Sequence, residues 1–348
     1  MKGGYGLVSH KIAKFWKAYP RIKAAVKCEL CPKYCIIPQN QKGFCRARKN
    51  EGGKLYTLVY GRPISVAIDP IEKKPLFHFL PGTKAYSFGV AGCNLSCIHC
   101  QNWEISQADP EYSYNLILEP EDIIKDIEAQ KDANIKSIAY TYTEPTIFIE
   151  YVIDTAKLAH RHGLKNNFHT NGFINEEPLK EVSRFMDAAN IDIKYFSNDI
   201  YMKNSQATLQ PILDAITILY KKGIWIELTH LIIPGINDSK RMTKQLCRWI
   251  VDNVGQDVPL HISRFYPAYK LSMVPPTDIK ALEDAVHIAE KEGIKFVYIG
   301  NIPHEKENTF CPSCKEMIVQ RRGFHLGTIN IKNGRCGFCA EKIPGVWG

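Results

Sequence analysis

The sequence lacks a long apolar run. No stretch of its 348 residues approaches the ~18 consecutive apolar residues that a membrane-spanning helix needs. Residues 1–16 also lack the apolar core of a signal peptide, because Lys2, His10, Lys11 and Lys14 interrupt them. Acidic residues are fewer than basic ones, 36 against 45, and the net charge is +9. We therefore expect a cytoplasmic protein without a membrane partner. The positive charge is compatible with RNA but is more typical of a solvated, lysine-rich surface.

The remaining composition is ordinary. Apolar residues make up 45% of the chain and charged residues 23%, as in most globular proteins. At about 150 residues per domain, the length suggests two units or one large barrel with additions. Composition therefore sets the size of the fold and leaves the function open.

The cysteines are more informative, because eleven of the twelve fall into three groups. In a cytosolic protein, clustered cysteines indicate metal or redox chemistry rather than disulfides. Only Cys247 stands alone, in a helical pattern where a small buried hydrophobic residue is expected. The groups are Cys28, Cys31, Cys35 and Cys45; Cys93, Cys97 and Cys100; and Cys311, Cys314, Cys336 and Cys339.

The middle of the chain alternates strand-like apolar runs with helical patterns, which predicts parallel strands joined by right-handed crossovers. The predicted strands are 85–90, 137–142, 167–170, 191–193, 224–231, 260–265 and 296–299. The predicted helices are 119–132, 146–162, 176–188, 210–222, 239–254 and 277–292. Six or seven such units favour an α/β fold with a partial or full (β/α) barrel. We divide the chain into an N-terminal extension with a four-cysteine metal module (1–83), the barrel core (84–302) and a zinc-ribbon-like module (303–348).

Nearly every predicted strand ends in side chains that can do chemistry. The carboxyl ends of barrel strands share one face, where such folds build their active sites. We therefore expect these groups to meet there, although boundary errors leave open that they are scattered over both strand ends. The candidates are Thr143, Glu144, Thr170, Asn171, Asp192, Lys194 and His261.

Each candidate also has a plainer interpretation. Glu144 could be a solvated acid or a charge at a helix N-terminus. Asp192 and Lys194 could form a surface ion pair, which contributes little to stability. Thr170 and Asn171 suit a turn, and a lone histidine in a strand, such as His261, is commonly a hydrogen-bonded core residue.

The central cysteines have the spacing C-x-x-x-C-x-x-C, so that only three lie in one loop. Four thiolates close an iron–sulfur cubane, whereas three leave one iron open to a small molecule with an amine and a carboxylate. Two alternatives remain on spacing alone. One is a zinc site with a distant fourth ligand such as His99, and the other is a structural cluster with its fourth ligand elsewhere.

Longer motifs around this loop carry a family resemblance. The run from Gly92 to Asn102, G-C-N-L-S-C-I-H-C-Q-N, resembles the radical S-adenosylmethionine (SAM) superfamily and, within it, the pyruvate formate-lyase activating group. The upstream run D-P-I-E-K-K-P-L-F-H-F, residues 69–79, and the cysteines before it resemble the radical enzyme of the AmmeMemoRadiSam system. The resemblance covers roughly residues 25–302.

The resemblance implies a mechanism and roles for particular residues. A reduced 4Fe–4S cluster would cleave SAM into methionine and a 5′-deoxyadenosyl radical, which abstracts hydrogen from the substrate. Cys93, Cys97 and Cys100 match the cluster ligands. Glu144, beside Thr143, matches the carboxylate that accepts hydrogen bonds from the ammonium group of SAM. The chain departs from the family pattern here, because it lacks the paired glycines before Glu144.

Further roles follow from the same resemblance. Asp192 and Lys194 match an Asp-x-Lys run that lies against cofactor and substrate, and Thr170 and Asn171 match a Thr-Asn-Gly run. The oxygens of Thr170, Asn171 and Asp192 are also candidates for holding a monovalent cation. Activases end their sixth strand with a histidine near the adenosyl group; the chain departs from that pattern, with His261 and Arg264 as the candidates on this strand.

The flanking cysteines predict two more metal sites. Cys311, Cys314, Cys336 and Cys339 form two C-x-x-C pairs, which is the zinc-ribbon pattern. Cys28, Cys31, Cys35 and Cys45 suffice for zinc, which we take as the first interpretation, or for a second Fe–S cluster.

The leading functional hypothesis is a radical SAM enzyme, an activase-like oxidoreductase that acts on a protein or peptide. It would need an electron donor of the ferredoxin or flavodoxin type, with Memo-like and AMMECR-like proteins as candidate partners. The first alternative is a radical SAM enzyme that modifies tRNA, whose RNA binding would weaken steeply with salt. An alternative of another class is a non-catalytic, metal-stabilised adaptor for nucleic acid or protein.

Overall fold

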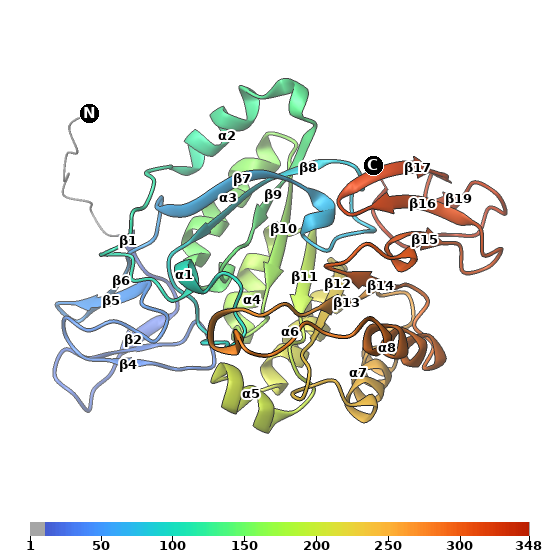
Figure 1. Cartoon of the computed structure of the whole chain (residues 1–348). Helices are drawn as coiled ribbons and strands as arrows, with labels where there is room; N and C mark the ends of the chain where they lie inside the picture. The colour runs from blue at the N-terminus through green and yellow to red at the C-terminus, as the bar shows by residue number, and fades with distance from the viewer. Residues whose placement is uncertain (1–10, 348) are drawn as a thin grey trace.

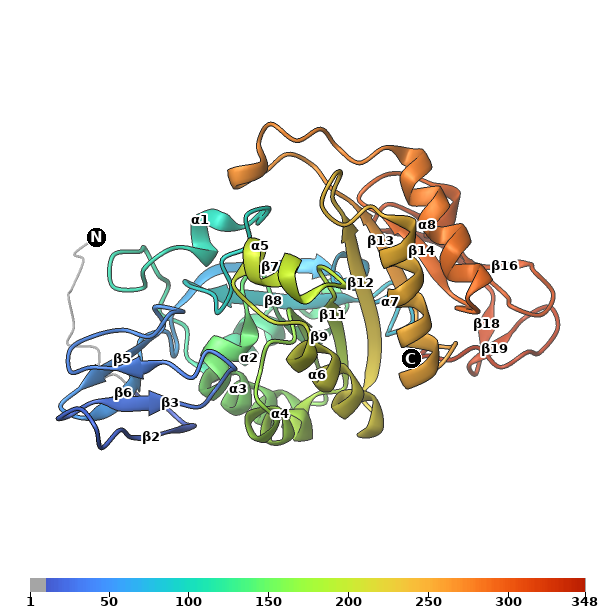
Figure 2. The same ribbon diagram turned by 90° about the horizontal axis from the view of Figure 1, so that it is seen from below.

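The computed structural model describes residues 11–347. Residues 1–10, on which most of the signal-peptide prediction rests, and Gly348 lie outside the described part. Three regions follow one another along the chain (Figure 1): a small N-terminal module, a central α/β core and a small C-terminal module. The two modules lie at opposite ends of the core in both views (Figures 1 and 2).

The core is built on one eight-stranded sheet with the order β14-β13-β12-β11-β10-β9-β8-β7. The seven strands from β8 to β14 run parallel, and β7 pairs antiparallel with β8 at one edge. Because β7 and β14 end the strand order, the barrel is partial rather than full. The strands are β7 (Pro63–Pro70), β8 (Lys84–Val90), β9 (Ile135–Tyr140), β10 (Lys165–Thr170), β11 (Ala188–Asp192), β12 (Trp225–Ile232), β13 (Leu260–Arg264) and β14 (Val297–Gly300).

Helices alternate with these strands and pack on the sheet: α3 on β9 and β10, α6 on β12, and α8 on β13 and β14. The helices are α1 (Trp103–Ser106), α2 (Pro120–Glu128), α3 (Ile149–Arg161), α4 (Glu176–Val182), α5 (Asn198–Ser205), α6 (Gln210–Lys221), α7 (Lys240–Asn253) and α8 (Ile279–Lys291). Six short 3₁₀ helices supplement them in the described chain: Ile71–Lys73, Lys131–Ala133, Pro145–Phe148, Ser183–Phe185, Tyr269–Leu271 and Glu305–Glu307. None of the helices within residues 11–347 is long and apolar enough to cross a membrane.

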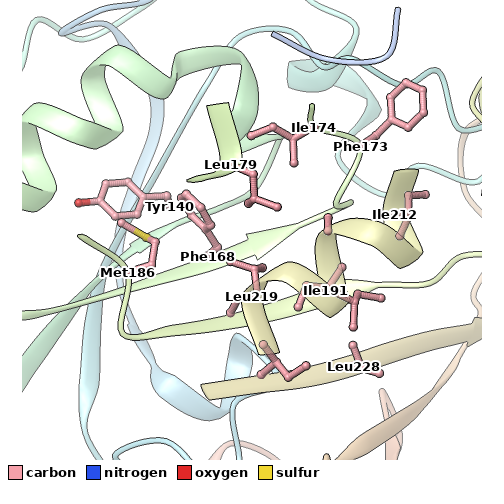
Figure 3. Packing of buried hydrophobic residues seen from close by; sticks show 14 of the residues in the cluster. Tyr140, Phe168, Phe173, Ile174, Leu179, Met186, Ile191, Ile212, Leu219 and Leu228 are labelled. Atoms are coloured by element: carbon pink, nitrogen blue, oxygen red, sulfur yellow. The ribbon is translucent and has the colours of Figure 1, made fainter. Parts of the chain in front are cut away.

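The main hydrophobic core lies between the sheet and its helices. Figure 3 shows Phe168 and Ile191 from neighbouring strands packing toward Leu179 of α4 and Ile212 and Leu219 of α6. All five are nearly or fully buried, so each removes a large apolar side chain from water, worth about 1.5–3 kcal/mol. This packing fixes the strands, and with them the loops at their carboxyl ends.

The N-terminal module consists of two small antiparallel sheets. Its strands are β1 (Lys11–Ile12), β2 (Trp16–Ala18), β3 (Val26–Cys28), β4 (Ile36–Ile37), β5 (Arg48–Glu51) and β6 (Lys54–Thr57). A buried ion pair between Arg48 and Glu150 of α3 fastens it to the core, and the backbone N–H of Lys14 donates to the same carboxylate at 2.7 Å.

The C-terminal module is a β-structure around four cysteines. Its strands are β15 (Thr309–Phe310), β16 (Met317–Arg322), β17 (His325–Ile329), β18 (Ile331–Lys332) and β19 (Arg335–Cys336). His78 joins it to the core, because its Nδ1 donates to the carbonyl of Pro344 at 2.7 Å while its Nε2 accepts from the Tyr298 hydroxyl at 2.6 Å.

The predicted α/β architecture is confirmed, with additions and boundary corrections. In the core, sequence patterns missed the edge strand β7 and the helices α1 and α5. Two predicted helices were too long: 119–132, where α2 ends at Glu128, and 176–188, where α4 ends at Val182 and Ala188 already begins β11. The division at residue 84 falls between two paired strands, β7 and β8, and stays a proposal.

Candidate active site

A cavity of about 540 Å³ opens at the carboxyl ends of the parallel strands. Its wall combines the cysteine loop after β8 with the ends of the strands that follow. All ten side chains that the sequence singled out for the cluster and cofactor line it: Cys93, Cys97, Cys100, Thr143, Glu144, Thr170, Asn171, Asp192, Lys194 and His261. Nine of them lie at or after the carboxyl ends of β8 to β11, whereas His261 is the second residue of β13 and reaches the cavity from within the sheet.

The three thiols of the central loop each have a polar neighbour. The backbone N–H of Leu95 donates to the Cys93 sulfur at 3.4 Å, and the Ser205 hydroxyl donates to that of Cys97 at 3.1 Å. The Cys100 sulfur lies 3.3 Å from the Ser106 hydroxyl. Hydrogen-bond donors stabilise thiolates, the form that binds metal. The surroundings of all three sulfurs thus suit metal ligation.

Helix α5 holds the cysteine loop in place through backbone hydrogen bonds. Its last residues accept two backbone hydrogen bonds, from Ser96 to Ser205 at 3.2 Å and from Ile98 to Asn204 at 3.0 Å. The helix begins at Ser197, whose hydroxyl accepts from the N–H of Ile200. Sequence patterns missed α5, although it positions one of the hydroxyls that contact the cluster cysteines.

A compact zinc site in this loop does not fit the geometry. His99, the distant fourth ligand considered from the sequence, already has its Nδ1 within 2.8 Å of the Tyr195 hydroxyl. Tetrahedral zinc with bonds of about 2.3 Å places its sulfur ligands roughly 3.8 Å apart. In residues 11–347, one group of three or more His, Cys, Asp or Glu side chains has all its ligand atoms within 4.8 Å of one another. That group lies in the C-terminal module and contains none of the cysteines of this loop.

Glu144 is held rigidly at the start of a 3₁₀ helix. Its Oε1 accepts from the Thr146 N–H at 3.0 Å, the Thr146 hydroxyl at 2.6 Å and the Thr170 hydroxyl at 2.7 Å. Its Oε2 accepts from the backbone N–H of Asn171 at 2.8 Å. A carboxylate has about four lone-pair positions on its two oxygens, so Oε2 keeps room for one more donor.

Within the described residues, Glu144 has no cationic partner, which is unusual for an acidic side chain buried this deeply. The residue is 1% exposed, and burial raises the pKa of its carboxyl group despite the four hydrogen bonds. None of the ion pairs in the described part of the chain includes it. A carboxylate buried against a cavity without a cation is suited to a cationic ligand.

Asp192 and Lys194 form a second charged pair at the cavity wall, with 2.8 Å between Lys194 Nζ and Asp192 Oδ2. His169 Nε2 lies 3.5 Å from the other carboxylate oxygen. Burial alone would raise the pKa of Asp192, but the charge of Lys194 and the contact with His169 hold it well below its ordinary value. The carboxylate is therefore ionised and partnered, and the monovalent cation stays a prediction.

Comparisons with known proteins agree with this geometry. A family model described as the Radical SAM superfamily matches residues 89–247. Uncharacterized protein MJ0808 of Methanocaldococcus jannaschii is 46% identical over 321 residues, covering 91% of this chain and 95% of that protein. The chain belongs to the radical SAM superfamily. Membership implies a 4Fe–4S cluster and SAM, and the three-thiol loop has a donor set that fits them.

The chain also has more distant similarities. The pyruvate formate-lyase-activating enzyme of Staphylococcus epidermidis is 24% identical over 237 residues, which cover 61% of this chain and 91% of that enzyme. Among solved structures, a radical SAM methyltransferase from Sphaerobacter thermophilus has 13% identity and a TM-score of 0.49, covering 64% of this chain and 68% of that one.

His261 belongs to a buried network on the floor of the radical SAM cavity. Its Nε2 lies 2.7 Å from Glu227 Oε2, and its ring stacks on Tyr298 with 5.1 Å between centroids. Glu227 also accepts the backbone N–H groups of Phe77 and His78 at 2.9 and 2.7 Å. His261 is therefore both a hydrogen-bonded core residue and a part of the cavity wall.

The run 69–79 carries part of the family resemblance, but its charged residues have no predicted role. Asp69 accepts from Lys73 at 2.8 Å, from Lys74 at 2.6 Å and from the Tyr142 hydroxyl at 2.6 Å. Burial lowers the pKa of Lys74 to about 8. The lysines and Tyr142 line the cavity, and so does Phe324 from the β16–β17 turn. The signal that could have found them is the pair of adjacent lysines in an apolar run.

The C-terminal cysteines form one compact group, with all four sulfurs within 4.8 Å of one another. The Cys311 and Cys339 sulfurs are 3.6 Å apart, and those of Cys314 and Cys336 are 3.7 Å apart. These separations match the edge of roughly 3.8 Å expected for zinc bonds of about 2.3 Å. The group is thus able to hold a metal ion.

The N-terminal cysteines converge differently. Cys28 ends β3, while Cys31, Cys35 and Cys45 lie in the loops that follow. No disulfide joins any of them. Their sulfurs do not lie within 4.8 Å of one another as the C-terminal sulfurs do, and this difference in spacing bears on which metal each group suits.

Proposed function

We propose that the chain is a radical SAM enzyme of the activase-like type that abstracts hydrogen from a protein or peptide. The observation that carries the proposal is the cavity in which three thiols and an unpaired buried carboxylate face one another. The bound cluster and SAM supply an electron and a 5′-deoxyadenosyl radical. The protein's own part is to bind, orient and exclude water.

Particular residues take these parts. Cys93, Cys97 and Cys100 hold the cluster, with donors already placed at their sulfurs. Glu144 accepts N–H bonds from the ammonium end of SAM, because Oε2 keeps an unused lone pair toward the cavity. Lys194, next to Asp192, places a fixed positive charge near the Cys97 sulfur, which favours the thiolate.

The substrate class rests on the relatives. Several similar proteins carry the name pyruvate formate-lyase-activating enzyme, and a protein substrate is what that name states of them. The 540 Å³ cavity, which must also hold SAM, leaves room for a side chain or chain segment rather than for a large metabolite. We further propose the AmmeMemoRadiSam assignment, Memo-like and AMMECR-like partners, a cytoplasmic location, and a ferredoxin- or flavodoxin-type donor.

The test is anaerobic reconstitution followed by reduction with SAM present. We expect methionine and 5′-deoxyadenosine in equal amounts, measured by mass spectrometry. Cys97→Ala should abolish both products, whereas Cys247→Ala, which alters a buried cysteine of α7 far along the chain, should keep them. Cofactor cleavage that persists in Cys97→Ala would refute the cluster assignment. No cleavage by the intact protein would favour the adaptor, and salt-sensitive RNA binding would favour tRNA modification.

The substrate is then identified by isotope transfer. Candidate proteins labelled with deuterium are incubated with the reduced enzyme and SAM, and deuterium is followed into 5′-deoxyadenosine. Transfer from a polypeptide supports the proposal, and transfer only from RNA contradicts the substrate class.

A further inference from the structure

The four N-terminal cysteines lie in one corner of the small module. The backbone of Cys28 donates to the carbonyl of Cys35 at 2.9 Å, which brings the two ends of the first loop together. The backbone N–H of Tyr34 donates to the carbonyl of Cys31 at 3.1 Å and turns the chain between Cys31 and Cys35. The backbone N–H of Phe44, the residue before Cys45, donates to the Cys35 sulfur at 3.4 Å and so brings the Cys45 segment to the same loop.

Their spacing differs from that of the C-terminal group. No three of these four sulfurs lie within 4.8 Å of one another, whereas the C-terminal sulfurs all do. Zinc with bonds of about 2.3 Å requires separations of roughly 3.8 Å. A 4Fe–4S cubane places four irons and four sulfides between its cysteines and holds their sulfurs about 6 Å apart. Within one chain, the compact group suits zinc and the wider group suits a cubane.

Fixed polar groups surround the wider group. The backbone N–H of Phe44 donates to the Cys35 sulfur at 3.4 Å, and the guanidinium of Arg48 approaches the Cys28 sulfur at 3.9 Å. Arg48 is 1% exposed and pairs with Glu150, so it cannot swing away. A buried guanidinium and an N–H donor both stabilise the negative charge of thiolate ligands.

The module also touches the loop of the radical SAM cluster. Gly92, which directly precedes Cys93, has φ +102, and a Cβ there would overlap the carbonyl oxygen of Cys45. The Lys33 ammonium lies 3.9 Å from the centroid of the Phe44 ring, beside Cys45, and donates to the carbonyl of Gln206. Gln206 follows Ser205, whose hydroxyl donates to the Cys97 sulfur. The two cysteine groups are therefore neighbours in space, although about fifty residues separate them in sequence.

We propose that Cys28, Cys31, Cys35 and Cys45 bind a second 4Fe–4S cluster that passes electrons to the cluster at Cys93, Cys97 and Cys100. With four protein ligands, every iron is closed, so this cluster transfers electrons and does not bind substrate. A reduced flavodoxin or ferredoxin loses one electron and the second cluster gains it. That cluster then returns to its oxidised state as it reduces the radical SAM cluster by one electron.

The existence of the second cluster stands independently of the proposed function, whereas its role as a relay rests on it. The triple variant C93A/C97A/C100A separates the two questions, because it leaves only the N-terminal cysteines for iron. After anaerobic reconstitution we expect about eight irons and one zinc per wild-type chain, and about four irons and one zinc per triple-variant chain. Mössbauer and EPR spectra of the triple variant should show a cubane. Two zincs and no iron in the triple variant would overturn the proposal, whatever the enzyme does with SAM.

The relay is tested with the double variant C31A/C35A, whose iron content should fall to about four per chain. With reduced flavodoxin as donor, we expect 5′-deoxyadenosine formation to fall at least about tenfold. With titanium(III) citrate, a small donor that reaches the radical SAM cluster directly, we expect it to fall less than about twofold. Equal rates of wild type and variant with flavodoxin would overturn the relay. If the variant does not fold, the matched measurement is freeze-quench EPR of wild-type protein at increasing times after mixing with reduced flavodoxin. Reduction of the second cluster before the radical SAM cluster supports the relay, and reduction of the radical SAM cluster first overturns it.

Discussion

Replacing Glu144 with glutamine exchanges one carboxylate oxygen for an amide nitrogen. The change tests whether Glu144 binds the ammonium group of SAM. The carboxylate carries three hydrogen bonds on Oε1 and one on Oε2, with no cation beside it. In Glu144→Gln, the carbonyl oxygen can keep the three-donor position while the amide nitrogen faces the N–H of Asn171. The variant therefore loses that hydrogen bond and, above all, the negative charge.

The expected loss follows from these contacts. A hydrogen bond between charged partners contributes about 1.5–3 kcal/mol, which corresponds to a rise of about 10- to 150-fold in the Kd of SAM. The opposed N–H groups cost a further ~1–3 kcal/mol, but they do so in the free protein as well and lower its folding stability. Affinity and stability should thus both fall, for separate reasons.

The assay is anaerobic equilibrium dialysis of reconstituted protein with two ligands. SAM has the ammonium group, whereas 5′-methylthioadenosine has the same nucleoside without the amino-acid end. We expect Glu144→Gln to weaken SAM and to leave 5′-methylthioadenosine within about twofold. An unchanged Kd for SAM, or an equal loss for both ligands, would refute the role of Glu144.

Three further predictions concern the scaffold. Gly92→Ala should lower the free energy of unfolding in urea by more than about 3 kcal/mol and lower the iron content, because the new Cβ would overlap backbone atoms at φ +102. The control is Gly163→Ala, where φ is +72 but the surrounding space is open, and it should cost only about 1–2 kcal/mol in the same measurement. Cys314→Ser should lower zinc by one per chain and leave iron unchanged in elemental analysis. Burial lowers the pKa of His78 from 6.5 to about 4, so the unfolded chain binds more protons than the folded one between these pH values. The free energy of unfolding should therefore fall by about 3 kcal/mol as the pH drops from 6.5 to 4. His78→Asn should flatten this pH dependence, measured by urea unfolding at a series of pH values.

The parallel core could be predicted because each of its strands is an apolar run followed by a helix. The edge strand β7 escaped because it is largely half-buried, without regular alternation, and has a proline at each end. Helix α5, N-D-I-Y-M-K-N-S, escaped because its few apolar residues form no broad stripe. Both of these elements owe their place to tertiary contacts: β7 to its ladder with β8, and α5 to the cysteine loop.

The candidate site could be predicted for the same reason as the core. Thr170 ends β10 and Asp192 ends β11, and topology alone brings the carboxyl ends of parallel strands to one edge. Lys74 and Phe324 belong to no strand–helix unit, so periodicity gives no reason to place them in the cavity. The spacing of the N-terminal sulfurs is likewise a property of loop geometry, which sequence spacing does not determine.

The two small modules complete the core at places where a partial barrel is open. The sheet ends at β7 and β14, and the C-terminal module attaches close to both, through His78 after β7 and through Tyr298 within β14. From there its β16–β17 turn extends Phe324 to the cavity wall. A segment of this size cannot hold such a turn by hydrophobic burial alone, so a metal at its four cysteines would keep Phe324 in position. The C-terminal module would then act on the cavity by shaping its wall, while the N-terminal module lies on the opposite side of the core, next to the cysteine loop (Figures 1 and 2).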